Sequence, residues 1–442
     1  MDKADIKKLS IYIPACLILL IFALIPFHAF LTVWGSSLFG HYTAIRLWKE
    51  YLLVVCVLGA AVIFSTDRKV RELFYRSKLI QLILVFLVIE LVWGTFSYNA
   101  GDVNTKALLY GWLSDTRYLI FFLVTLVISK KTALLRNKSI KFVIWPAVIV
   151  ILFGLLQFLV LPKDFLSHFG YGPNTIYPFE TINHNSQYLR IASTLRGANP
   201  LGAYLLVPLS LAAVLLMRRR KTWQMIIFII AGTAVMIFSF SRSAWLGLII
   251  ALALAIYWGI KNREVKKRLL YVAVILVIVA GALFVIERNN SRVQNIVFHS
   301  QTNSAIKTTS DQAHSNAITT GLKQFATKPL GTGPGTAGAS SVYNNHPANI
   351  PENYYLQIGL ETGWLGLVVF LAINLLVALS LWRRRGDALS LALLISLIGL
   401  IVCNLLLEAW SDDTLCYLWW GLAGIAIAIK PKIGASKNNW II

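Results

Sequence analysis

The chain has 442 residues, of which 57% are hydrophobic and only 14% are charged, and its mean hydropathy is +0.68. No water-soluble domain of this size carries so little charge, so the composition excludes a soluble globular protein and predicts many membrane spans. The formal net charge of +22 would favour a nucleic-acid partner in a soluble protein. In a membrane protein, the positions of the basic residues along the chain show whether they bind a partner or set the membrane topology.

The predicted fold class is an all-α polytopic membrane protein with about 12 transmembrane helices, forming a single integral membrane domain over residues 1–442. About 20 apolar residues are needed to cross the bilayer core. Runs of roughly that length begin near Ile11, Ala44, Leu79, Arg117, Phe142, Pro200, Trp223, Ser243, Leu269, Tyr354, Ala388 and Asp413. The first run follows three lysines, as a signal peptide would, but no small-residue cleavage site follows it, so we interpret it as a retained span.

The connecting loops divide by charge. Of the 41 Lys and Arg residues, 28 fall in one alternating set of loops, namely 1–10, 66–78, 130–141, 218–222, 261–268, 383–387 and 430–442. The positive-inside rule places these loops and both termini in the cytoplasm. The positive charge is therefore mainly a topology signal with membrane lipid headgroups as its partners, and we expect no nucleic-acid partner.

Two extracytoplasmic segments are longer than a simple connection requires: residues 162–199 and residues 287–353. Loops longer than about 12–15 residues are usually functional or disordered. The second segment contains two stretches compatible with a helix, SRVQNIVFHS and HSNAITTGLKQFA. We therefore expect it to form a partly helical cap between the ninth and tenth spans.

Three arginines lie on these external segments. Arg190 and Arg196 precede Asn199 and Pro200, a pair typical of a helix N-terminus, and Arg242 lies in a short connection between two apolar runs. Arginine binds phosphate with two hydrogen bonds and stays charged where water is scarce, so together they could clamp a diphosphate. The alternative is that each one reaches outward to lipid headgroups.

The stretch from Gly331 to Gly366 combines a glycine-rich turn with ionisable residues at the start of an apolar helix. Its glycines resemble a phosphate-binding loop only superficially, because no strand–helix unit of a nucleotide-binding fold surrounds them. We expect these glycines to form a flexible turn over the active site. His346 and Glu352 are the candidates for a general base, although His346 could be an ordinary loop histidine and Glu352 could serve the helix dipole.

Asp412 and Asp413 begin the last span on the external side. Paired carboxylates could bind a metal or exchange protons, or they could cap the helix. No further Asp, Glu or His residues at ligand spacing support a metal site, so none is predicted. The four cysteines lie in or beside apolar runs and match no metal or disulfide pattern, so we interpret them as packing residues.

Three motifs of this chain resemble the O-antigen ligase and O-antigen polymerase superfamily of bacterial membrane glycosyltransferases. They are RIASTLRGANPLGAYL, SFSRSAWLGL and ENYYLQIGLETGWLGL, of which the last is the most specific. The resemblance covers nearly the whole length, and its 12 spans with a large external loop are similar to the ligases. It implies transfer of a glycan from undecaprenyl diphosphate to an acceptor hydroxyl outside the cytoplasmic membrane, without a nucleotide, a metal or another cofactor.

The resemblance also implies residue roles. Arg190, Arg196 and Arg242 match the arginines thought to hold the diphosphate, and Asp412 or Asp413 matches an acidic residue near the last span of ligases. The ligases usually have histidine immediately before Asn353, where this chain has Glu352. This departure leaves open which residue is the base.

The acceptor is also left open. It is a glycan or a lipid-linked acceptor in a ligase, and a second lipid-linked glycan in a polymerase; we favour the ligase because of the long loop. A membrane transporter is the alternative outside the enzymes, but it should carry internal repeats with polar residues near the midplane. Here the polar clusters lie at the external boundary, which favours a transferase over a transporter. The resemblance implies a metal-independent enzyme of the bacterial inner membrane, and a single displacement would invert the anomeric configuration.

Overall fold

The computed structural model describes residues 3–182, 185–218, 222–260, 262–287, 290 and 310–429. Its longer helices, in chain order, are α1 (Lys3–Leu24), α2 (His28–Phe39), α4 (Trp48–Thr66), α6 (Lys78–Ala100), α7 (Thr105–Ser129), α8 (Leu134–Leu159), α9 (Ala198–Met217), α10 (Thr222–Phe238), α11 (Arg242–Gly259), α12 (Arg263–Ile286), α14 (Ser310–Thr327), α15 (Tyr354–Arg383), α16 (Ala388–Leu406) and α17 (Asp413–Ala428). The shorter elements are η1 (Ile25–Phe27), α3 (Tyr42–Arg46), α5 (Arg68–Arg76), η2 (Phe165–Phe169), β1 (Glu180–Ile182), β2 (Asn185–Arg190), η4 (Gly338–Tyr343) and η5 (Ala409–Ser411).

The prediction of an all-α polytopic membrane protein is confirmed. Within the described residues, nine helical segments are long and apolar enough to cross a membrane, and α10 and α17 are shorter apolar helices. Each of the 12 predicted runs lies on a helix, although α7 begins at Thr105 rather than near Arg117. The earlier start places Asp115 and Arg117 inside a membrane-spanning helix, where both side chains are buried.

The helix α17 lies at the centre of the bundle. All of its residues are buried, and it packs against α7 and α16. Small residues allow this close approach: a side chain at Gly421 would meet the Phe121 ring, and one at Gly424 would meet Thr125. Outer helices such as α4 and α6 instead expose apolar side chains, among them Leu58 and Phe96, as expected of surfaces that face lipid.

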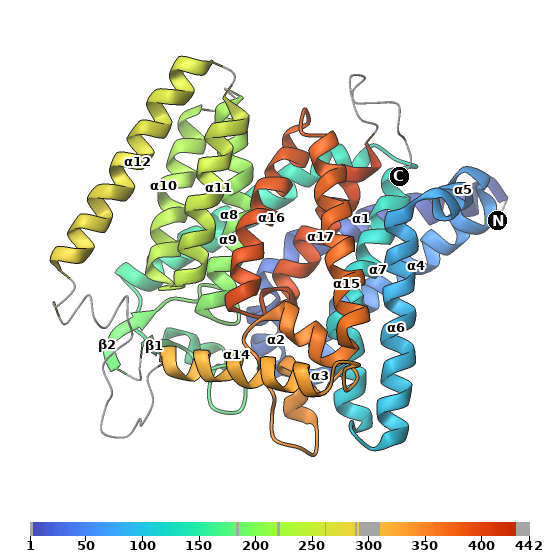
Figure 1. The fold of residues 1–442 in the computed structure, drawn as a ribbon. Helices are drawn as coiled ribbons and strands as arrows, with labels where there is room; N and C mark the ends of the chain where they lie inside the picture. The colour runs from blue at the N-terminus through green and yellow to red at the C-terminus, as the bar shows by residue number, and fades with distance from the viewer. Residues whose placement is uncertain are drawn as a thin grey trace.

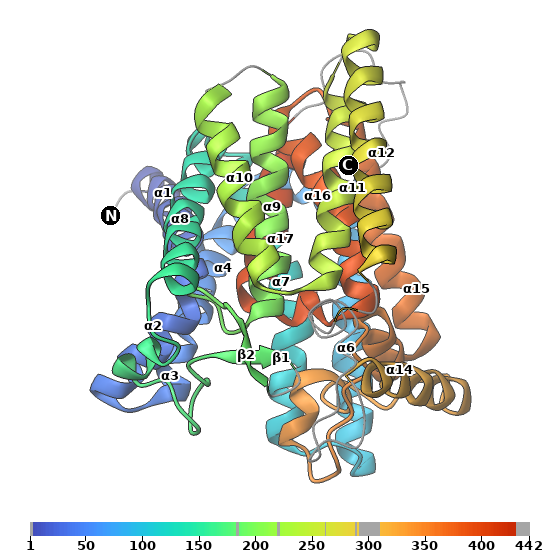
Figure 2. The ribbon, with the colours of Figure 1, turned by 90° about the vertical axis from the view of Figure 1, so that its left-hand side faces the viewer.

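The elements outside the bundle gather at one end of it. In Figures 1 and 2, α3, α14 and the hairpin of β1 and β2 lie at the lower end, whereas α5 and the start of α1 lie toward the other end. The helix α14 lies across the bundle and packs on α15. It contains the whole of the predicted HSNAITTGLKQFA helix, while the SRVQNIVFHS stretch lies outside the described residues.

The hairpin leads directly into α9. Its strands are antiparallel and pair Glu180 with Arg190. The expectation that Asn199 would cap the following helix is wrong: Gly197 is the N-cap, and the N–H of Ala198 donates to Glu180 Oε1 at 3.2 Å. The Asn199 side chain is unavailable for capping because it accepts a hydrogen bond from Arg190.

The glycine-rich turn after α14 is docked against the bundle instead of extending freely over a site. Gly331, Gly333, Gly335 and Gly338 all have positive φ angles between 64° and 90°. At each of them a side chain would come within 2.4 Å of an atom of α6, α7 or α15. The N–H of Gly335 also donates to Glu361 Oε1 at 2.7 Å, which fastens the turn to α15.

Candidate functional site

Asp412 connects the start of α17 to Arg196. Its side chain caps the helix by accepting hydrogen bonds from the N–H groups of Thr414 and Leu415, at 3.0 and 3.2 Å. Its other oxygen accepts from Arg196 Nε at 3.1 Å. The carboxylate is buried, whereas the Arg196 side chain is 51% exposed, so Asp412 orients a guanidinium whose remaining N–H groups face open space.

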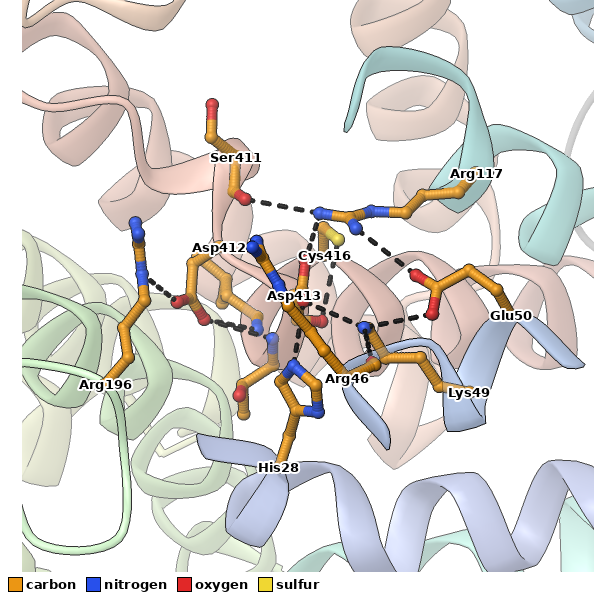
Figure 3. A network of polar contacts seen from close by, with 12 residues as sticks. His28, Arg46, Lys49, Glu50, Arg117, Arg196, Ser411, Asp412, Asp413 and Cys416 are labelled. Carbon is orange, nitrogen blue, oxygen red and sulfur yellow. Dashed lines mark hydrogen bonds and ion pairs between the residues drawn. The ribbon is translucent and has the colours of Figure 1, made fainter. Parts of the chain in front are cut away.

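The adjacent Asp413 belongs to a buried ionic network (Figure 3). Its carboxylate contacts His28 Nε2 at 3.0 Å, Lys49 Nζ at 2.9 Å and the guanidinium of Arg117. Glu50 completes the network by pairing with Lys49 at 3.0 Å and with Arg117 at 3.3 Å. Two carboxylates thus balance two cations, and the network joins α2, α4 and α7 to the start of α17.

The sequence analysis missed this network and its partner residues. The available signal was that Lys49, Glu50 and Arg117 lie within or beside apolar runs, where an ionisable residue needs a partner and is a functional candidate. Sequence spacing could not pair them, because the contacts join residues from four separate helices.

Arg190 is largely committed to contacts within the protein. It donates from Nε to the carbonyl of Ser239 at 3.0 Å and from Nη2 to Asn199 Oδ1 at 2.6 Å, and Nη1 lies 3.6 Å from Glu180. Burial lowers the pKa of its guanidinium; Glu180 opposes this effect, and the nearby charge of Arg242 adds to it. The structure therefore brings Arg190 close to Arg242 and ties the hairpin to the starts of α9 and α11.

Glu352 and Asn353 form the entry to α15. Asn353 is the N-cap: its Oδ1 accepts from the N–H of Leu356 at 3.0 Å, and its Nδ2 donates to the carbonyl of Leu405 at 3.0 Å. The Glu352 carboxylate pairs with Nδ1 of His314, and its side chain is 41% exposed. His314 lies on α14, so this helix supplies a partner for Glu352 that was not predicted from the sequence.

His346 lies apart from Glu352. It is exposed in the loop between η4 and α15, and it lines none of the three cavities described below. The adjacent segment is held against the start of α7, where Asn104 Nδ2 donates to the carbonyl of Tyr343 at 2.7 Å and to Asn345 Oδ1 at 3.1 Å.

Each of the three sequence motifs contains one non-glycine residue in the left-handed region. These residues are Ser193, Phe240 and Glu352, each with a φ angle of 51°. Such a backbone costs about 1–3 kcal/mol and persists where the surrounding structure fixes it, often at functional sites. Ser193 precedes Arg196 by three residues, Phe240 precedes Arg242 by two, and the third strained residue is Glu352 itself.

Three cavities meet at Arg196, which contributes to the lining of all of them. The first, here called the Glu352 cavity, has a volume of about 500 Å³ and is also lined by Glu352, Glu408 and Asp412. The second, here called the Arg46 cavity, measures about 320 Å³. A third, of about 150 Å³, reaches Asp412 and the ionic network.

Glu408 is a further candidate in the Glu352 cavity. Burial raises the pKa of its carboxyl to about 8; Arg196 opposes this rise, and the carboxylates of Asp115 and Glu352 add to it. The group therefore carries a proton at neutral pH, and such perturbed groups in a cavity are candidates for proton exchange.

The acidic residues around these cavities do not form a cluster suited to a metal. Within the described ranges, no group of three or more His, Cys, Asp or Glu side chains is placed to hold a metal ion. The arrangement offers instead a guanidinium, an accessible carboxylate and a protonated carboxyl around one space.

Comparison with known proteins adds one finding. No curated protein matches the chain, but residues 227–371 match the family model described as O-antigen ligase. The matched segment runs from α10 into α15 and includes Arg242, α14 and Glu352, whereas Arg196 and Asp412 lie outside it. This match over residues 227–371 and the membrane-spanning helices support the resemblance to the O-antigen ligase and O-antigen polymerase superfamily.

Proposed function

We propose that this protein transfers a glycan from undecaprenyl diphosphate to an acceptor hydroxyl on the external face of the bacterial inner membrane. The observation that carries the proposal is that Arg196 and Glu352 line one cavity of about 500 Å³, so a cation for a diphosphate and a carboxylate for an acceptor proton share a space. The family match supports glycan transfer by a ligase or polymerase.

The arginines would stabilise the leaving group. When the bond between the anomeric carbon and the diphosphate oxygen breaks, the lipid diphosphate keeps the electron pair, and a preoriented guanidinium stabilises the developing charge. Asp412 orients Arg196 for this role. Arg242 is the second proposed contact, and Arg190, with its three partners in the protein, holds the surrounding backbone in place.

The acceptor would be activated by Glu352. As its oxygen attacks the anomeric carbon, its proton passes to the carboxylate, which typically accelerates a reaction about 10²–10⁴-fold. The contact with His314 fixes the carboxylate, and Asn353 fixes the start of the helix that carries it. A single displacement of this kind inverts the anomeric configuration and needs neither a metal nor another cofactor.

The arginine clamp is tested in proteoliposomes given polyprenyl-diphosphate glycan and candidate acceptors. We expect Arg196→Ala and Arg242→Ala each to reduce the transfer rate about 10²–10³-fold, as the loss of a preorganised cation should. The control is Arg136→Ala, because Arg136 is exposed on α8 and lies on a predicted cytoplasmic loop. Transfer close to the wild-type rate in both clamp variants would overturn the proposal.

The base is tested by comparing three substitutions under the same conditions. We expect Glu352→Gln to lose most turnover while substrate binding persists, His314→Ala to lose less, and His346→Ala to match the wild type. A loss confined to His346→Ala would assign the role of base to His346.

The acceptor that is consumed separates ligase from polymerase. Extension of one lipid-linked glycan by another identifies a polymerase, whereas transfer to a different acceptor identifies a ligase; we favour the ligase because of the cap around α14. If glycan is transferred to neither acceptor, the assignment as a transferase is wrong.

A further inference from the structure

We propose that the Arg46 cavity binds an oxyanion group, a carboxylate or a phosphate, on the acceptor glycan. Arg46 would bind the anion, and Tyr110 and Tyr343 would pack against the sugar that carries it. The proposal rests on the function proposed above and assigns the second cavity to the acceptor. The cavity lies between α3, α7 and η4, and its volume of about 320 Å³ is within the range of ligand pockets, about 300–1,000 Å³.

Arg46 has an unused guanidinium. Among the described residues it forms no hydrogen bond or ion pair; its close contact is the Tyr110 ring, whose centroid lies 5.8 Å from the guanidinium carbon. Against the opposing effect of burial, the charge of Asp413 raises the pKa of the Arg46 guanidinium, but the Asp413 carboxylate is in direct contact with His28, Lys49 and Arg117 rather than with Arg46. A half-buried guanidinium with no direct ion pair favours an anionic ligand.

The charged residues that line the Arg46 cavity, counted with their ion-pair partners, leave an excess of one positive charge. The described cations are Arg46, Lys49, Arg117 and Arg196, and the carboxylates that pair with them are Glu50, Asp412 and Asp413. With His28 neutral, each carboxylate is matched by a paired cation and Arg46 remains. An anion bound at Arg46 would therefore complete the charge balance in a partly dehydrated site.

The cavity wall has the aromatic surface that a sugar requires. The rings of Tyr110 and Tyr343 are stacked, with centroids 4.5 Å apart and planes inclined by 25°. Lys106 Nζ lies 4.5 Å from the centroid of Tyr343 and adds a positive charge to this surface. Aromatic rings with a polar tip bind groups that are partly apolar, as the faces of sugar rings are.

The position of Arg196 connects this cavity to the proposed reaction. Arg196 lines both the Arg46 cavity and the Glu352 cavity, and Ile350 also borders both. A glycan held at Arg46 would thus extend toward the carboxylate proposed as the base. The same arginine would separate the donor diphosphate on one side from the acceptor on the other.

Binding is measured first, because it does not depend on turnover. Purified protein in nanodiscs is titrated with glucuronate, glucose 6-phosphate and neutral glucose while its thermal unfolding is followed, since a ligand that binds the folded state raises Tm. We expect the two charged sugars to stabilise the wild type and glucose to have no effect. A preference for one charged sugar would identify the anion as a carboxylate or a phosphate.

The variant Arg46→Ala should weaken binding of the charged sugars about ten- to hundredfold, as the loss of a charge-assisted hydrogen bond does. The substitution keeps the Arg46 carbonyl, which accepts from Lys49 Nζ at 3.0 Å, so the network should persist. The variant Arg46→Lys should retain part of the affinity for the charged sugars. Tyr343→Phe should retain most of this affinity, and Tyr343→Ala should retain little of it. Arg136→Ala is the control for an unspecific loss of positive charge.

Three outcomes would overturn the inference: equal stabilisation by glucose and glucuronate, unchanged binding in Arg46→Ala, or binding lost equally in Arg136→Ala. In the transfer assay, Arg46→Ala should raise KM for a charged acceptor and leave KM for the lipid-linked donor unchanged. A raised donor KM would instead place Arg46 in the diphosphate clamp. If transfer fails in the wild type while Arg46-dependent binding persists, only the proposed function is refuted.

Discussion

Two consecutive carboxylates at the start of α17 have different environments. Asp412 caps the helix and contacts the half-exposed Arg196, whereas Asp413 lies inside a network of buried ions. Because successive side chains point in different directions around a helix end, Asp412 reaches the Glu352 cavity, whereas Asp413 points to the buried cations and borders only the third cavity. Removing the Asp413 carboxylate would leave buried cations unpaired, a defect that typically destabilises a protein by about 3–5 kcal/mol. Mutating Asp412 and Asp413 one at a time would separate the contact with Arg196 from this effect on stability.

The pH dependence of stability should report the environment of Glu408. Burial raises the pKa of this carboxyl from an ordinary value of 4.5 to about 8, so the folded protein keeps a proton that the unfolded chain releases. The stabilising contribution is fully present below about 4.5 and is lost as pH rises through about 8. We expect the difference in Tm between the wild type and Glu408→Gln to fall over this window and to be constant outside it.

The measurement is a series of thermal unfolding curves of both proteins in detergent. The glutamine variant keeps the shape of the side chain and cannot titrate, so it is the matched reference at every pH. Parallel Tm curves for the two proteins between pH 4.5 and 8 would contradict the assignment of a raised pKa to Glu408.

At the scale of elements, the glycine-rich turn shows how a segment read as flexible from its composition becomes fixed by packing. Gly335 has a φ angle of +86°, and a side chain there would lie 2.3 Å from the carbonyl oxygen of Ala107. Its N–H group is hydrogen-bonded to Glu361. The turn thereby positions the loop that leads to Glu352 against α7 and α15.

We therefore expect Gly335→Ala to be markedly destabilising. A left-handed backbone costs a non-glycine residue about 1–2 kcal/mol, and overpacking adds typically about 1–3 kcal/mol. Gly101→Ala is the matched control, because Gly101 has a φ angle of +81° and no atom within 4 Å of the added carbon, so only the backbone cost applies. Comparable losses of Tm in the two variants would show that close packing at Gly335 contributes little.

At the scale of the whole molecule, charge and architecture point to the same orientation. The sequences that follow α9, α11 and α15 are rich in basic residues, and the C-terminal ends of these helices lie at the end of the bundle opposite α14 and the β-hairpin. If the basic end faces the cytoplasm, as the positive-inside rule predicts, we expect the cavities and α14 to lie on the external side.

This orientation is tested with two single cysteines in a Cys16→Ser background, where the other native cysteines are buried. Ala348 and Gly386 are both exposed and lie in loops at opposite ends of the bundle. We expect a membrane-impermeant maleimide added to intact spheroplasts to label Ala348→Cys and to spare Gly386→Cys until the membrane is permeabilised. The reverse pattern would place the cavities in the cytoplasm.

The sequence by itself determined the membrane-spanning class, the approximate position of most apolar helices and the motifs that contain Arg196, Arg242 and Glu352. These properties are local: an apolar run of sufficient length spans a bilayer wherever it occurs, and a motif is contiguous in the chain. The start of α7 was misplaced because its first turns are amphipathic, and the partners of Asp413 were invisible because they come from other helices.

The tertiary structure alone decided which charges are paired and which remain available. In the folded protein, Arg190 is hydrogen-bonded to other groups of the chain, and Arg196 lies where three cavities meet. Glu352 contacts His314 on α14, whereas the Arg46 guanidinium forms no direct ion pair. A charge acquires its role from the groups within a few ångströms of it, because the energy of an ion pair depends on distance and on the exclusion of water. Those neighbours are set by helix packing, which a single sequence does not specify.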